Sequence, residues 1–257
     1  MDAEISKSLN EFVNKANVLL DGSIVSAYCY GSAVYGDFHQ GYSDLDFFII
    51  SENLITEDDF NTFSLLRSEF KASRNPYFSV LEGEIISKKA IKNDIESNAI
   101  YWGTKNDRLN NKYNLSGFSL KGLIDNGYLI YGNDLKNEFP YPNEKKMLAQ
   151  VDSMIETIRK YAQVVKEDIH SLDWLFLICQ SIFWLKTLNV TGKTNAAKWL
   201  SENCSIEWID TLQRAILLRQ EPMLAKLNEN RVWIGKLGKT IQYACNTLQN
   251  ERKCYIS

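Results

Sequence analysis

A Gly-Ser turn near the amino terminus has the composition of a phosphate-binding loop. Gly31 and Ser32 directly follow the apolar run Ile24 to Tyr30, which predicts a buried strand. Glycine allows the backbone to approach a ligand where a Cβ atom would clash. The N–H groups of the turn, and of a short helix expected to begin at residues 33–35, would then face phosphate oxygens. The stretch therefore predicts a turn that holds a phosphate group.

Two aspartates open the next apolar run. Asp44 and Asp46 stand two residues apart at the head of a strand that is predicted to continue to Ile50. Side chains two apart in a strand point to the same face, so both carboxylates are aimed at one point. Paired carboxylates favour a hard divalent cation such as Mg²⁺. The chain has only two histidines, His39 and His170, which argues against a zinc site.

A third carboxylate is available on a later strand, predicted within residues 77–86. Alternation sets Glu82 and Glu84 on the same side of that strand, and spacing alone does not choose between them. Taken singly, a Gly-Ser turn is often an ordinary turn, and an Asp-x-Asp triplet an ordinary strand entry. Their order along one chain is what favours a functional site.

The order of these motifs resembles that of a known superfamily. G-S-x-x-x-G followed by S-D-x-D and an apolar strand is similar to the signature of the DNA polymerase β-like nucleotidyltransferases. Within it, residues 30–34 (YGSAV) and 43–46 (SDLD) most resemble the bacterial aminoglycoside adenylyltransferases that modify streptomycin and spectinomycin. The resemblance implies a magnesium-dependent enzyme that moves AMP from ATP to a hydroxyl of such an antibiotic and releases pyrophosphate, which would confer resistance.

The resemblance also implies how the acidic residues are used. Asp44 and Asp46 would bridge two Mg²⁺ ions about 4 Å apart. The general base of the family is a glutamate shortly before an Ile-Ile or Val-Ile pair, which corresponds to Glu82, with Glu84 as the alternative. The expected catalytic and metal-binding residues are Asp44, Asp46 and Glu82.

Residues 191–194 (TGKT) also look like the end of a P-loop. A P-loop requires a glycine five residues before Gly192, where Thr187 stands, and it follows a strand rather than a helix. The P-loop interpretation therefore fails. The family resemblance implies instead that Lys193 or Lys198 reaches the triphosphate, and an exposed surface lysine is the structural alternative. The residues expected at the nucleotide are Gly31, Ser32, Ser43 and Lys193.

Two residues are expected at the acceptor. In the resembled enzymes, a tryptophan late in the first domain and an acid at the start of the second helix of the bundle contact the antibiotic. Trp102 and Asp173 stand near those places. Core packing is the other explanation for Trp102, and pairing with the dipole of a helix amino terminus is the other explanation for Asp173.

The chain changes character at Pro140 and Pro142. This punctuation predicts domains over residues 1–142 and 143–257. The expected fold class is α/β (α+β), with an N-terminal nucleotidyltransferase domain that has a small mixed sheet and helices on one side. A C-terminal all-α helical bundle of five helices, the last over Val232 to Leu248, would close the substrate cleft. In the first domain, residues 3–20, 57–71 and 120–130 predict helices.

Composition excludes several other classes of protein. The formal net charge of −3 argues against a nucleic-acid partner, because phosphate backbones are bound by clustered basic residues. Asp2 and Glu4 precede any apolar run, which is unlike a signal peptide, and charged residues interrupt the most apolar segment, Leu172 to Val190. Five scattered cysteines fit idle thiols in a reducing compartment. We expect a cytoplasmic protein without membrane contact, either a monomer or a weak homodimer.

Other functions remain compatible with the motifs. The same chemistry would serve a lincosamide acceptor, or a protein hydroxyl as in toxin-neutralising AMP transferases. A catalytically idle nucleotide-binding module is the alternative from another class, although it has no reason to retain mutually repelling carboxylates. Nucleic-acid polymerisation is the weakest alternative, given the acidic balance of the chain.

Overall fold

The computed structural model describes residues 1–91 and 97–255, and the chain forms two compact units. The sheet unit comprises Met1–Gly36 and Asp44–Pro142, and the helical unit comprises Asp37–Ser43 and Asn143–Ser257. The short segment Asp37–Ser43 lies in sequence between the Gly-Ser turn and the paired aspartates, yet it packs as part of the helical unit. No local pattern in the sequence predicted this grouping.

The sheet unit is built on one six-stranded sheet of the described residues, in the order β5-β4-β3-β2-β1-β6. Strands β2 and β3 are parallel, and every other neighbouring pair is antiparallel. The predicted mixed sheet and fold class are thereby confirmed. The strands are β1 (Ile24–Cys29), β2 (Leu45–Ser51), β3 (Leu81–Ser87), β4 (Ala99–Trp102), β5 (Asp107–Asn110) and β6 (Tyr128–Gly132).

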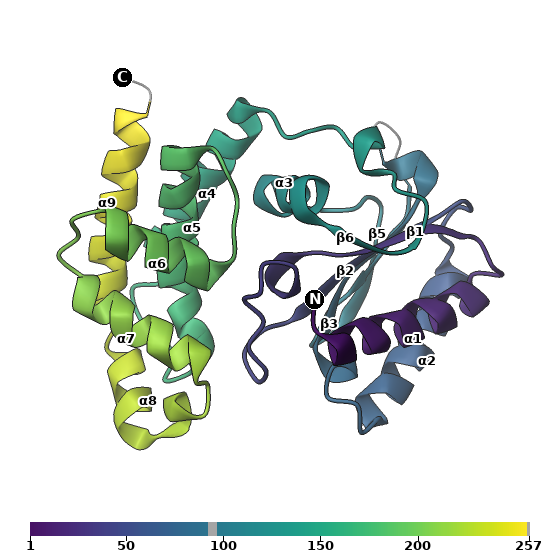
Figure 1. The fold of residues 1–257 in the computed structure, drawn as a ribbon, viewed down its shortest axis with the longest axis horizontal. Coiled ribbons are helices and arrows are strands. Elements are labelled where there is room, and N and C mark those ends of the chain that lie inside the picture. Colours follow the sequence, from purple (N-terminus) through teal and green to yellow (C-terminus); the bar gives the residue numbers. More distant parts are fainter. Residues whose placement is uncertain (92–96, 256–257) are drawn as a thin grey trace. The chain divides into compact units, whose positions relative to one another are not determined.

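Helices cover both faces of this sheet (Figure 1). On one face, α1 (Ala3–Leu19) packs against Phe47, whose ring centroid lies 4.6 Å from that of Phe12, and α2 (Glu57–Ala72) packs beside it through Phe70, whose ring centroid lies 5.9 Å from that of Phe12. On the other face, α3 (Gly117–Asn126) packs against Phe48. The prediction of helices on one side was wrong, because Phe47 and its neighbour Phe48 point to opposite faces and both are fully buried.

The predicted helix over residues 120–130 was also wrong in its second half. Helix α3 ends at Asn126, and the N–H of Gly127 bonds to the carbonyl of Leu123 as the backbone turns to an extended conformation. Residues 128–132 then form β6, which pairs antiparallel with β1. The apolar residues that looked like the end of a helix therefore build an edge of the sheet.

The helical unit contains six helices among the described residues, where five were predicted. The predicted last helix is two helices, separated at Lys236 and Leu237 and flanked by Gly235 and Gly238. Glycine weakens a helix, and its presence here accounts for the break. No helix in the described part of the chain has the length and apolar character that crossing a membrane requires. The helices are α4 (Glu144–Tyr161), α5 (Asp173–Thr187), α6 (Lys193–Asn203), α7 (Ile209–Gln220), α8 (Asn228–Gly235) and α9 (Gly238–Cys254).

Candidate active site

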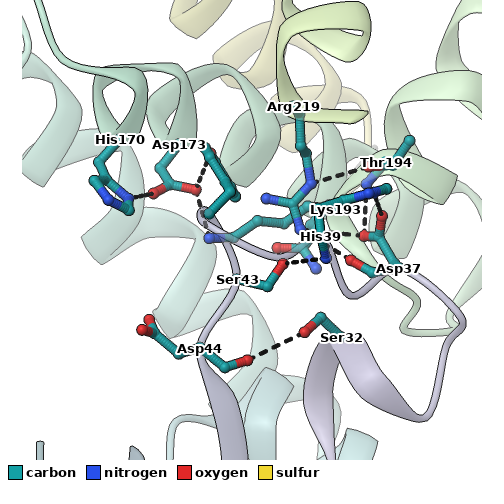
Figure 2. A network of polar contacts seen from close by, with 12 residues as sticks. Ser32, Asp37, His39, Ser43, Asp44, His170, Asp173, Lys193, Thr194 and Arg219 are labelled. Carbon is teal, nitrogen blue, oxygen red and sulfur yellow. Dashed lines mark hydrogen bonds and ion pairs between the residues drawn. The ribbon is translucent and has the colours of Figure 1, made fainter. Parts of the chain in front are cut away.

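The Gly-Ser turn is held against the head of β2. The N–H of Tyr30 donates to the carbonyl of Asp46 at 3.1 Å, and the Ser32 hydroxyl donates to the carbonyl of Asp44 at 3.3 Å (Figure 2). Gly31 has a φ of +68°, and a Cβ atom built on it would overlap the carboxylate of Asp46. The structure thus brings the predicted phosphate-binding turn into contact with a predicted metal-binding side chain.

Asp46 and Glu82 are neighbours across β2 and β3. The two residues are direct partners in the parallel register, so their side chains leave the sheet on the same side. Burial raises the pKa of Tyr30 well above its usual value, and the charges of Asp46, Glu84 and Glu82 add to that rise. Carboxylates from two strands therefore act electrostatically on one phenol beside the Gly-Ser turn.

The two candidate bases have different surroundings. Glu82 accepts a hydrogen bond from the Tyr101 hydroxyl. Glu84 is 5% exposed, and both its carboxylate oxygens accept from the N–H of Asn114, at 3.0 and 3.1 Å. Burial raises the pKa of Glu84 to about 7, although the Asn114 N–H and the charge of Arg108 oppose the rise. A buried carboxylate tied to backbone fits a structural role, which favours Glu82 as the base.

Tyr101 contacts the candidate base Glu82, and the sequence analysis did not single it out. Its hydroxyl contacts Glu82, and the Arg108 guanidinium lies 4.6 Å from the centre of its ring. Burial raises the pKa of Tyr101 above its usual value, as do the hydrogen bond to Glu82 and the nearby charge of Asp44. No signal in the sequence indicated this contact, because it depends on the pairing of Tyr101 with Glu84 across β4 and β3, and β4 was not predicted.

The described residues do not by themselves form a complete metal site. In the ranges 1–91 and 97–255, no group of three or more His, Cys, Asp or Glu side chains is arranged to hold an ion. What the structure shows at the acids is Asp46 beside Gly31, Glu82 in register with Asp46, and Asp44 at the head of the same strand.

Two other predicted residues lie together in the helical unit. The Lys193 ammonium is 2.5 Å from a carboxylate oxygen of Asp173 (Figure 2). The Tyr42 hydroxyl donates to the same oxygen at 2.8 Å. Burial alone would raise the pKa of Asp173, but the charge of Lys193 and hydrogen bonds from His170, Lys193 and Tyr42 hold it well below its usual range. Lys198, the alternative to Lys193, is exposed on α6.

The remaining predicted residues are buried. Trp102 is 1% exposed and packs edge-on against Phe12 and Phe70 under α1 and α2, at centroid distances of 5.2 and 6.3 Å. Of the two roles weighed for Trp102, these surroundings fit core packing rather than contact with an acceptor. Ser43 lies in the helical unit, where its hydroxyl accepts from the N–H of His39 at 3.0 Å.

Comparison with known proteins agrees with this geometry. Residues 5–107 match the family model of the nucleotidyltransferase domain, a span that contains the Gly-Ser turn and all the candidate acids of the sheet unit. No curated protein matches the sequence. Among solved structures, the chain is similar to spectinomycin adenyltransferase AAD(9) from Enterococcus faecialis, which was crystallised with ATP and spectinomycin. The two share 16% identity over 94% of this chain and 96% of that one, with a TM-score of 0.62.

These comparisons bear out the expectation of a nucleotidyltransferase enzyme and of its fold. The family match covers the residues that carry the motifs, and the structural match extends over both units. Residues 5–107 match a nucleotidyltransferase domain, and the chain as a whole has a fold similar to that of spectinomycin adenyltransferase AAD(9).

Proposed function

We propose that the protein transfers AMP from ATP to a hydroxyl of an aminoglycoside-type antibiotic and releases pyrophosphate. The observation that carries the proposal is the contact between Gly31 and the Asp46 carboxylate, with Glu82 in register beside Asp46. A turn whose backbone N–H groups lie next to paired acids suits a nucleoside triphosphate. That the similar solved structure contains ATP and spectinomycin supports the choice of nucleotide and acceptor.

The acids of the sheet unit fit magnesium in their chemistry. Asp44, Asp46 and Glu82 offer hard oxygen donors, two of them on adjacent parallel strands, which is the donor type that Mg²⁺ prefers. We assign these three residues as the ligands of two ions. Magnesium held there would neutralise charge on the leaving pyrophosphate and acidify the acceptor hydroxyl. The hydrogen bond from the Ser32 hydroxyl to the carbonyl of Asp44 holds the phosphate-binding turn against the start of the strand that carries the acids.

Residues of the chain would bind the phosphates and accept the proton of the acceptor hydroxyl. The N–H groups of Gly31 and Ser32 bind phosphate oxygens, so that the α-phosphorus is held for attack. Glu82 accepts the proton of the acceptor hydroxyl on the oxygen that Tyr101 leaves free, because the Tyr101 hydroxyl engages Oε1. This hydrogen bond also orients the carboxylate. Negative charge develops on the phosphate oxygens, and positioned donors stabilise it most effectively where water is excluded.

The helical unit would supply further substrate contacts. Lys193 carries a positive charge suited to the triphosphate, and Asp173 carries a negative charge suited to the ammonium groups of the antibiotic. In the structure these two charges neutralise each other. Ser43 is assigned to the nucleotide with the turn that precedes it in the sequence.

The test is an incubation of the purified protein with ATP, Mg²⁺ and single acceptors. Spectinomycin and streptomycin form the first arm, a lincosamide the second, and a bacterial lysate the third, with transfer of radiolabelled AMP as the readout. Labelling of an aminoglycoside, with equimolar pyrophosphate, supports the proposal. Labelling only of the lincosamide or of a lysate protein assigns the same chemistry to that acceptor. ATP binding without transfer in any arm identifies an idle nucleotide-binding module.

A further inference from the structure

Asp37–Ser43 joins the Gly-Ser turn to the paired aspartates. On one side it continues from Gly36, which ends the turn, and on the other it continues into Asp44. Since the segment packs with the helical unit, the backbone that leads into the candidate acids is anchored by helices far away in the sequence. How firmly it is anchored bears directly on how well those acids are placed.

Asp37 provides the first anchor by capping α6. Helix α6 begins after Gly192, which has no side chain to cap it. The Asp37 carboxylate takes that place, because its Oδ2 accepts from the N–H of Thr194 at 2.9 Å across 157 positions of sequence. His39 Nε2 lies 3.1 Å from the other oxygen. A carboxylate at a helix amino terminus satisfies free N–H groups and opposes the helix dipole.

Arg219 on α7 provides the second anchor. Its guanidinium lies 3.4 Å from Asp37 Oδ2, and its Nε donates to the Thr194 hydroxyl at 2.9 Å (Figure 2). The side chains of Arg219 and Asp37 are 3% and 1% exposed, so this is a buried ion pair. The guanidinium also lies 4.4 Å from the centre of the Tyr42 ring. Arg219 therefore contacts the segment near both of its ends, at Asp37 and at Tyr42.

The rest of the segment is fixed as well. The N–H groups of Tyr42 and Ser43 both donate to the carbonyl of His39, at 3.0 and 2.9 Å, which makes a closed turn. The Tyr42 hydroxyl donates to Asp173 at the start of α5. Three helices of the helical unit therefore hold this seven-residue segment in place.

We propose that Asp37 and Arg219 are positioning residues: their buried pair fixes the segment 37–43, and so sets the geometry of Asp44 and Asp46 for nucleotidyl transfer. The inference rests on the proposed function. A buried ion pair contributes little net stability compared with an apolar pair, because both charges are desolvated. Its presence at this place is explained by the conformation that it selects for the segment.

The test compares three variants: Asp37→Asn, Arg219→Met, and the two combined. Each single variant leaves one buried charge without its partner and so lowers the melting temperature. The double variant removes both charges and recovers much of that loss. Turnover behaves differently, because the anchor is missing in all three variants. We expect kcat to fall roughly 10- to 100-fold in each, as displacements of about 1 Å do, with KM for ATP changed less than about threefold.

Two further variants separate positioning from general stability. Arg219→Lys keeps the charge and should recover part of kcat. Asp152→Asn breaks another ion pair of the helical unit, between Asp152 and Arg252 at 2.8 Å, and should leave kcat unchanged at 25 °C. Recovery of kcat in step with melting temperature in the double variant would overturn the proposal, and so would a drop in kcat for Asp152→Asn as large as that for Asp37→Asn.

Amide hydrogen exchange provides a readout that does not depend on activity. In Arg219→Met, exchange over residues 37–46 must rise at least about tenfold relative to the wild-type protein, since the segment loses its anchor. If the wild-type protein transfers no AMP to any acceptor, the proposed function fails, and exchange over these residues alone decides the inference. Unchanged exchange at residues 37–46 overturns it whatever the activity.

Discussion

The carboxylate of Asp46 occupies the space in which a side chain on Gly31 would begin. This contact places the Gly-Ser turn directly beside β2. The hydrogen bond from the Tyr30 N–H to the Asp46 carbonyl holds the two backbones together at the same point. A phosphate held by the turn would therefore lie beside the acids. Because the relationship depends on the missing Cβ atom, it is open to a direct test.

Gly31→Ala should lower kcat by much more than its loss of folding stability explains. Gly36 offers a matched control, since its φ of +65° is like the +68° of Gly31 but no atom lies within 4 Å of its missing Cβ. Both substitutions carry a backbone cost of about 1–2 kcal/mol. Only Gly31→Ala displaces Asp46, and we expect its kcat to fall about 100-fold further. Equal kcat values for the two variants would show that the contact has no catalytic meaning.

Tyr101→Phe should lower kcat without weakening ATP binding. The variant keeps the ring under Arg108 and removes only the hydroxyl that holds Glu82. A hydrogen bond to a charged group contributes about 1.5–3 kcal/mol, so we expect roughly a tenfold loss or more in kcat. Tyr113→Phe removes a buried hydroxyl that donates to the Ile91 carbonyl at 2.9 Å and serves as the control. Steady-state kinetics in which both variants lose activity equally would refute the role of Tyr101.

Trp102→Phe should lower the stability of the protein and leave the KM for the acceptor nearly unchanged. Trp102 is enclosed by aromatic residues of the sheet unit, so a smaller ring leaves a gap. We expect the free energy of unfolding to fall by about 1–3 kcal/mol, with KM for the acceptor changed less than about twofold. The measurement is urea unfolding together with acceptor titration. A large rise in acceptor KM at unchanged stability would restore Trp102 as a substrate contact.

Lowering the pH should reduce the stability of the helical unit, because Asp173 becomes protonated. Because its folded-state pKa lies below the unfolded value of about 3.9, the carboxylate contributes stability above that pH and loses it as the pH falls toward the folded pKa. The stability difference between the wild-type protein and Asp173→Asn should therefore be full at pH 6 and shrink below about pH 4. Lys193→Met removes the main partner and should show the same shrinkage.

Tryptophan fluorescence is a suitable probe for this pH series, since five of the six tryptophans lie in the helical unit. Melting curves recorded from pH 3 to pH 7 would contradict the prediction if the difference between wild type and Asp173→Asn grew toward low pH.

Local sequence patterns predicted the parts of the site that are local. The apolar runs before Gly31 and after Asp44 gave β1 and β2 to within a residue, because buried strands leave a clear pattern. The position of β6 was missed, since its residues continue an apolar helix pattern past Gly127. The Asp37 and Arg219 pair could not be predicted, because it joins residues 182 positions apart and depends on how the helices pack.

The choice between Glu82 and Glu84 shows the same limit. Alternation placed both on one side of the strand, and the register of β3 agrees. What distinguishes them is the backbone N–H of Asn114 at Glu84 and the Tyr101 hydroxyl at Glu82, and both come from distant segments. Periodicity describes a strand's faces, whereas a side chain's partners belong to the tertiary structure.

The most direct test of the account is the turnover of Asp46→Asn. The substitution keeps the size of the side chain and removes the negative charge beside Gly31, so the fold and the melting temperature should be retained, with Asp58→Asn on the exposed start of α2 as the control. We predict that pyrophosphate release with ATP, Mg²⁺ and spectinomycin falls at least about 100- to 1,000-fold in Asp46→Asn and stays at the wild-type rate in Asp58→Asn. Release of pyrophosphate by Asp46→Asn at the wild-type rate would contradict the assignment of this site.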